Sequence, residues 1–349
     1  MNHRIKATRT GNKPVAIHRD NPVAPAWPSF QGNSQFVGTS PTGRVTVYVD
    51  PTLGDPALQN AQDLVNDADR VVTANDGIFG TTGGPVSAIV FALGGATDGT
   101  GGADHMGCDY STGAAIEVCA SFGNSARVSA LFEAELSECS MNGNLCGLST
   151  GEALSRWCAT VIGNNALADF ATAPQWAQDG EPDFVNQTDN TDQNADSTGC
   201  GMAFLSWLIS QGYGLEKIAP AMVNLGDSGT LAQLYAVLTS DDAANAFPNF
   251  QNALQNLPDG VTSDDPFGGL AQPTQMVHLA PRTAEVVGRI FATIVADLAV
   301  GRQPEQIMAN VRAAMLPVVS SGKAPTVCSP KSKRLLPPSK PGRRASKSA

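Results

Sequence analysis

The sequence lacks long apolar stretches. No run of apolar residues approaches the ~18 that a membrane-spanning helix needs, and the first 20 residues lack the apolar core of a secretory signal. With 349 residues and 42% hydrophobic content, the chain is long enough to bury a full core. We therefore expect a soluble, globular protein located in the cytoplasm.

The motifs of several enzyme classes are also missing. The chain has no G-x-S-x-G motif and no phosphate-binding glycine motif, so nothing supports a serine hydrolase triad or a nucleotide site. None of the seven cysteines forms a C-x-x-C pair, which argues against a zinc finger or a dithiol redox centre. Cys139, Cys146 and Cys158 could pair with one another only in an oxidising compartment.

Positive charge is scarce outside the two ends of the chain. Residues 1–20 carry five Lys/Arg and residues 330–349 carry seven, which leaves ten bases against 31 acids in residues 21–329. Such an acidic body repels nucleic acid and anionic membranes. We expect the basic ends to be solvated tails, and the Pro- and Lys/Arg-rich C-terminal tail could dock a protein partner.

The order of the predicted elements indicates an α+β fold. Alternation and apolar period predict strands at 45–50, 87–93 and 115–122 and helices at 56–74, 125–141 and 151–163, followed by a mostly helical C-terminal half. The expected divisions are an irregular N-terminal arm (1–43), an α/β body (44–256), a linker (257–281), a helical hairpin (282–319) and a disordered basic tail (320–349).

The predicted helix 125–141 carries carboxylates on its apolar side. On a helical wheel, Glu135 falls inside the apolar stripe and Glu138 at its edge, whereas Glu133 falls opposite and should face water. The stripe consists of Val128, Phe132, Leu136 and Cys139. Burying an ionised carboxylate without a partner costs several kcal/mol. Glu135 is therefore interpreted either as a cleft carboxylate or as a structural acid tied to an arginine.

Three further residues are candidates for a supporting role. Glu152 and Arg156 lie four apart on the next predicted helix, a spacing that favours an ion pair, and a surface salt bridge is the simplest explanation. His105 is the only histidine near the candidate cleft, although a surface histidine with a satisfied side chain is the default interpretation.

The order of the predicted elements and the residues of the helix 125–141 together resemble the zincin metallopeptidases. In that family, strands and an edge strand precede an active-site helix with the motif H-E-x-x-H. Ala134-Glu135-Leu136-Ser137-Glu138 stands at the matching place. The resemblance implies that Glu135 is the general base, that Glu138 replaces the second metal ligand and that Glu152 matches a third ligand. The first histidine is replaced by Ala134.

The segments AELSE, GEALSR and DSTGCGMAFLSWLISQGY are also similar to blocks found, in this order, in a set of uncharacterised bacterial proteins. Zinc prefers nitrogen and sulfur donors, so carboxylates without histidine favour a harder divalent cation at Glu135, Glu138 and Glu152, or no metal.

Two functions follow as hypotheses. The first is a carboxylate-based hydrolase of peptides or glycans, in which Glu135 and Glu138 are catalytic and Glu152, Arg156 and His105 are supporting. The second is a non-catalytic binding protein derived from a metallopeptidase fold.

Overall fold

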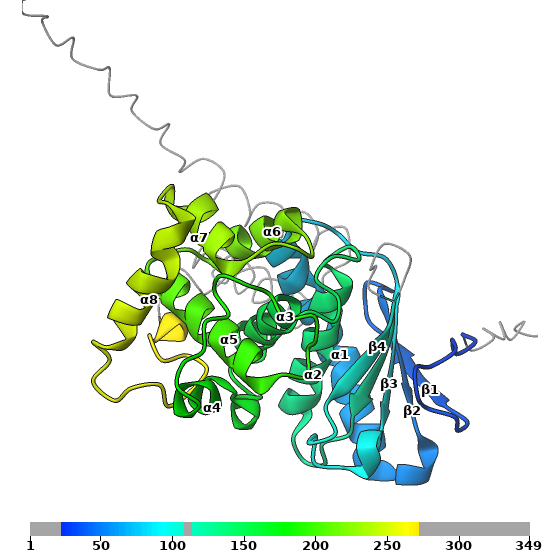
Figure 1. Cartoon of the computed structure of the whole chain (residues 1–349). Coiled ribbons are helices and arrows are strands. Elements are labelled where there is room, and N and C mark those ends of the chain that lie inside the picture. The colour runs from blue at the N-terminus through cyan, green and yellow to red at the C-terminus, as the bar shows by residue number, and fades with distance from the viewer. Residues whose placement is uncertain (1–21, 108–113, 272–349) are drawn as a thin grey trace, which may run out of the picture. The chain divides into compact units, whose positions relative to one another are not determined.

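The computed structural model describes residues 22–107 and 114–271. The chain divides into two units, Met1–Val277 and His278–Ala349, and the second lies outside the described residues. The predicted hairpin 282–319 and the basic tail 320–349 therefore also lie outside them. The first unit joins a mixed sheet to a group of helices, which confirms the α+β class (Figure 1).

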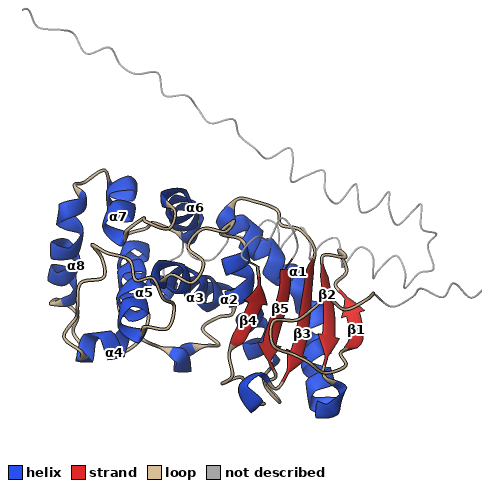
Figure 2. Ribbon diagram, turned by 45° about the vertical axis from the view of Figure 1, so that its right-hand side comes forward, coloured by secondary structure: helices blue, strands red, loops and turns tan. Residues whose placement is uncertain are grey.

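The described strands form one five-stranded sheet in the order β1-β2-β3-β5-β4 (Figure 2). The three central strands are parallel, and an antiparallel strand closes each edge. The strands are β1 (Gln35–Thr39), β2 (Val45–Val49), β3 (Val86–Phe91), β4 (Ala103–Met106) and β5 (Ala114–Cys119).

One face of the sheet packs against helices. Alternate residues of the central strands point to this face, among them Val47, Ala88 and Ile116, which are fully buried. Two helices cover it: α1 (Asp55–Phe79) lies on β1, β2 and β3, and α2 (Ser125–Cys139) lies on β5 and β4. Strand β4 therefore borders α2.

Residues 22–34, which we call the strap, cover the opposite face of the sheet. Trp27 packs edge-on against Tyr48, and Phe30 packs edge-on against Phe91. Glu117 in β5 is fully buried on this face, where its carboxylate accepts hydrogen bonds from Ser29 N at 2.9 Å, Ser29 Oγ at 2.6 Å and Phe30 N at 2.6 Å. The sheet thus has two covered faces, and the strap is held on one of them by aromatic packing and by the hydrogen bonds that Glu117 accepts.

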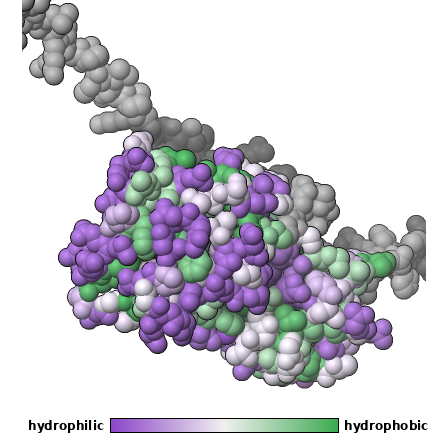
Figure 3. Space-filling model, in the orientation of Figure 1, coloured by the Kyte–Doolittle hydropathy of each residue, from purple (hydrophilic) through white to green (hydrophobic). Residues whose placement is uncertain are grey.

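The remaining described helices form the second half of this unit. Helix α3 packs on α2, and α5 packs on α3 and α4. On the side of the molecule shown in Figure 3, hydrophilic residues dominate the surface of this helical half. The helices are α3 (Ser149–Ile162), α4 (Ala173–Gln178), α5 (Ala195–Ser210), α6 (Leu215–Leu225), α7 (Leu231–Thr239) and α8 (Ala246–Leu254).

For three segments, the prediction of irregular structure is wrong within the described residues. The expected N-terminal arm contains β1 and the strap, whose aromatic residues pack without any sequence period. The glycine-rich residues between the predicted strands 87–93 and 115–122, where no strand or helix is predicted, contain the four-residue strand β4. The expected linker is fixed over residues 257–271, because Asp264 accepts hydrogen bonds from Thr172 N and Ala173 N, and Asp265 accepts one from Ser206 Oγ.

No described helix combines the length and the apolar character that crossing a membrane requires. Cys146 is disulfide-bonded, whereas Cys139 and Cys158 are in the thiol form, so a disulfide among these three cysteines is not what the structure shows. Disulfides persist mainly in oxidising compartments. The cytoplasmic location stays a prediction.

Candidate metal-binding site

Helix α2 begins at a side-chain cap and is packed on more than one side. The Asn124 side chain accepts a hydrogen bond from Arg127 N, which satisfies one of the backbone donors of the first turn. The sheet and α1 cover one side of α2, and α3 covers another. Glu135 and Glu138 lie three residues apart, so their side chains leave the helix in neighbouring directions.

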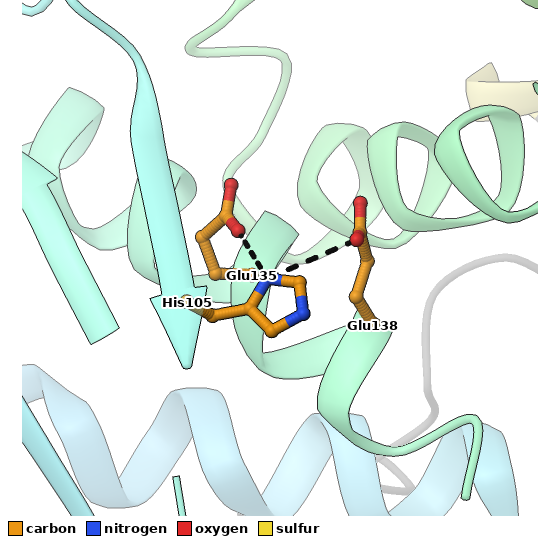
Figure 4. A group of neighbouring side chains, drawn as sticks. All are labelled: His105, Glu135 and Glu138. Atoms are coloured by element: carbon orange, nitrogen blue, oxygen red, sulfur yellow. Dashed lines mark hydrogen bonds and ion pairs between the residues drawn. The ribbon is translucent and has the colours of Figure 1, made fainter. Parts of the chain in front are cut away.

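Strand β4 directs His105 toward these carboxylates. His105 pairs in register with Ile116, and directly opposed residues of an antiparallel pair point to the same face of a sheet. Because Ile116 faces the helices, the imidazole also points toward α2 (Figure 4). The next residue in each direction, Asp104 or Met106, points to the opposite face.

The three side chains converge on one point. His105 Nδ1 lies 2.8 Å from Glu135 Oε2 and 3.9 Å from Glu138 Oε2 (Figure 4). One ligand atom from each residue lies within 4.8 Å of the others, and this is the group of His, Cys, Asp and Glu side chains in the described residues that is close enough to hold a metal ion. The side chains are 11%, 15% and 12% exposed in the order His105, Glu135, Glu138, so the site is shielded yet reachable.

Helix α3 adds Glu152 and Arg156 behind this group. The Glu152 side chain lies close to that of Glu138, because the two carboxyls influence each other's pKa, and this places Glu152 on the same side as the helix α2 acids. Arg156 lies 3.9 Å from Glu152 and 3.7 Å from Asp264. The predicted ion pair between Glu152 and Arg156 is therefore confirmed, but it does not lie on the open surface: Arg156 is 16% exposed and pairs with Asp264 as well as with Glu152.

Burial and surplus negative charge change the pKa values of the site. Burial raises the pKa of Glu135, and it raises the pKa of Glu138 well above its usual range, with the charges of Glu135 and Glu152 adding to the effect. Burial also raises the pKa of Glu152 to about 7, against the opposing effect of Arg156. The carboxylates outnumber the bases around them, so the group retains protons near neutral pH.

The surplus of negative charge also acts on His105. Burial lowers the pKa of His105, but the hydrogen bond to Glu135 and the negative charges of Glu135, Asp104 and Asp192 outweigh it, and the pKa is raised. Asp192 belongs to the loop between α4 and α5, which is fixed to the start of α3 by hydrogen bonds between Ser149 and Asp189. Sequence reasoning did not connect Asp192 with this group, because no local pattern links residues 105, 135 and 192.

Glu133, predicted to face water, is fully buried. The prediction is wrong because α2 is covered by α1 and α3 as well as by the sheet, so the side opposite the apolar stripe is also inside the protein. Neither carboxyl oxygen has a hydrogen-bond partner among the described residues. Burial raises the pKa of Glu133 well above its usual range, while Arg70 lowers it and Asp76 raises it to smaller extents.

Replacing Glu133 by leucine should raise the free energy of unfolding at neutral pH by about 1–3 kcal/mol, because a buried polar group without a partner is lost. A carboxyl with a higher pKa in the folded protein holds its proton more tightly there, so the contribution of Glu133 to stability falls as pH rises above about 4.3. Urea unfolding at several pH values checks this, with Glu216→Gln as the exposed control. A Glu133→Leu variant less stable than the unaltered protein at pH 7 contradicts it.

No family model, curated protein or solved structure matches this chain. The resemblance to zincins therefore stays a prediction, based on residues 134–138 and on the order of the elements.

Proposed function

We propose that this protein is a hydrolase that depends on a divalent cation, with Glu135 as its general base. One observation carries the proposal: an imidazole from the edge strand of the sheet meets two carboxylates of the adjacent helix, with His105 Nδ1 2.8 Å from Glu135 and 3.9 Å from Glu138. The resemblance to zincins supports it, because Glu135 and Glu138 stand at the positions of the base and of the second ligand.

In this proposal His105 supplies the imidazole that is missing at Ala134. The helix motif has no nitrogen donor, but β4 brings one to the same carboxylates. Bonds of about 2.0–2.2 Å join transition-metal ions to imidazole and carboxylate ligands, so two donors of one ion lie at most ~4.2 Å apart. The 3.9 Å between His105 Nδ1 and Glu138 Oε2 is within this limit and would shorten on binding at a tetrahedral angle. His105 and Glu138, together with Glu152 from α3, would hold the cation.

The mixed donor set also changes the choice of metal. The expectation that zinc binds poorly assumed carboxylates without histidine, whereas the group contains an imidazole. Imidazole suits zinc and carboxylates suit manganese, so a site with both kinds of donor is compatible with either metal. The surplus of negative charge further supports a cation, because a divalent ion would replace the protons that the carboxylates otherwise retain.

The residues of the site have different roles in the proposed hydrolysis. A divalent cation at this position would polarise the scissile carbonyl or glycosidic oxygen and lower the pKa of a nearby water. Glu135 takes a proton from the attacking water and returns it to the leaving group. A general base of this kind contributes about 10²–10⁴-fold to the rate. Arg156 partly balances the charge of Glu152, and peptide and glycan bonds are both suitable substrates.

The proposal is tested by the metal content of the purified protein and by calorimetric titration with Mn²⁺, Zn²⁺ and Ca²⁺. We expect one cation per chain, bound more tightly for Mn²⁺ and Zn²⁺ than for Ca²⁺ because the imidazole is a poor calcium ligand. His105→Ala should remove stoichiometric binding, and the exposed control Glu216→Gln should retain it.

The second candidate, a non-catalytic binding protein, is favoured by the direct His105–Glu135 contact, which partners both groups without a metal. A protein that binds none of the three cations, and that hydrolyses neither peptides nor glycans, would support this second function and exclude the first.

A further inference from the structure

The segment GEALSR contains Ser155, which lies outside the motif at residues 134–138 and has no role in the proposed hydrolysis. Ser155 is 1% exposed and lies on α3, one turn after Glu152. Its hydroxyl oxygen lies 3.1 Å from Glu138 Oε1 and 2.9 Å from the backbone carbonyl oxygen of Glu152. Both separations are hydrogen-bond distances, and the hydroxyl has one proton to donate.

The two oxygens of Glu138 therefore face different partners. Oε1 is directed at Ser155 on α3, whereas Oε2 is the atom 3.9 Å from His105 Nδ1 on β4. The last torsion of a glutamate side chain is broad, so packing alone leaves a carboxylate free to turn. A donor fixed on the neighbouring helix holds one oxygen and thereby directs the other.

We propose that Ser155 is a positioning residue of the site: its hydroxyl holds Glu138 Oε1, so that Oε2 points to the place where His105 and Glu135 converge. This inference rests on the proposed cation site and adds the outer contact that orients one of its ligands. Outer contacts of this kind typically change metal affinity by about 10–100-fold when they are removed.

Ser155→Ala tests the role through the affinity of the full chain for Mn²⁺, measured by calorimetry. We expect an affinity about 10–100-fold weaker than that of the unaltered protein. Ser155→Thr keeps the hydroxyl and should restore most of the affinity, which a merely structural role would not predict. Ser137→Ala is the matched control, because Ser137 is buried next to Glu138 but donates to Ala134 O within its own helix.

A second measurement separates this inference from the proposed function. The imidazole resonances of His105 should shift in Ser155→Ala without added metal, and they should stay in place in Ser137→Ala. If the unaltered protein binds no cation, the proposed function is wrong and these resonances alone decide the role of Ser155. An unchanged Mn²⁺ affinity in Ser155→Ala, or unchanged His105 resonances where no cation binds, overturns the positioning role.

Discussion

Glu135→Gln should lower the rate of hydrolysis by about 10²–10⁴-fold while one cation per chain remains bound. Glutamine keeps the size of the side chain and its proximity to His105, but its amide cannot accept a proton from water. The loss should therefore fall on kcat, with little change in KM, because the substrate meets an unchanged surface. Turnover of peptide and glycan panels, together with metal analysis of the same samples, measures both quantities.

The control for this variant is Glu216→Gln, which makes the same chemical change on the exposed surface of α6. Equal turnover by Glu135→Gln and the unaltered protein would exclude Glu135 as the base. Loss of the cation in Glu135→Gln would instead make Glu135 a ligand, which contradicts the division of roles proposed for His105, Glu138 and Glu152.

Glu117→Ala should lower the free energy of unfolding by about 3–5 kcal/mol. The backbone N–H groups of Ser29 and Phe30 would lose this acceptor in two partly buried hydrogen bonds, and each lost hydrogen bond costs about 0.5–1.5 kcal/mol. The removed side chain would also leave a cavity in a fully buried position. Urea unfolding measures the loss, and faster proteolysis between residues 22 and 34 would locate it in the strap.

Glu117→Gln separates the hydrogen bonds from the packing. Glutamine fills nearly the same volume and retains one oxygen that can accept from Ser29 N and Phe30 N, so the loss should be smaller, about 1–2 kcal/mol. A loss of equal size in both variants would mean that the charge, rather than the two backbone contacts, holds the strap.

The sequence predicted the parts of the fold that repeat a period over many residues. The helices and the three central strands follow from apolar spacing, and the predicted range 125–141 closely matches α2. Strand β4 could not be predicted in this way, because four residues within a glycine-rich stretch contain too few positions to show alternation. The strap is held by individual contacts of Trp27, Phe30 and Glu117, which have no period at all.

The same distinction between local pattern and long-range contact applies to the site. Two carboxylates on one helix could be recognised from their spacing, because the helix sets that geometry locally. Their partners come from other elements: the position of His105 depends on the register of β4 against β5, and that of Ser155 depends on how α3 packs on α2. The error at Glu133 has the same origin, since a helical wheel gives direction but not which neighbours cover each side.

The place of β4 at the sheet margin has a consequence for the proposed cation. Within the described residues this strand is short and pairs with β5 alone, so it belongs to the part of the fold where fraying costs least. The nitrogen donor would then sit on a segment that opens more readily than the helix that carries the oxygen donors. An ion bound by donors from β4 and from α2 would link the edge strand to the helix. Its binding free energy would add directly to the local stability of the strand.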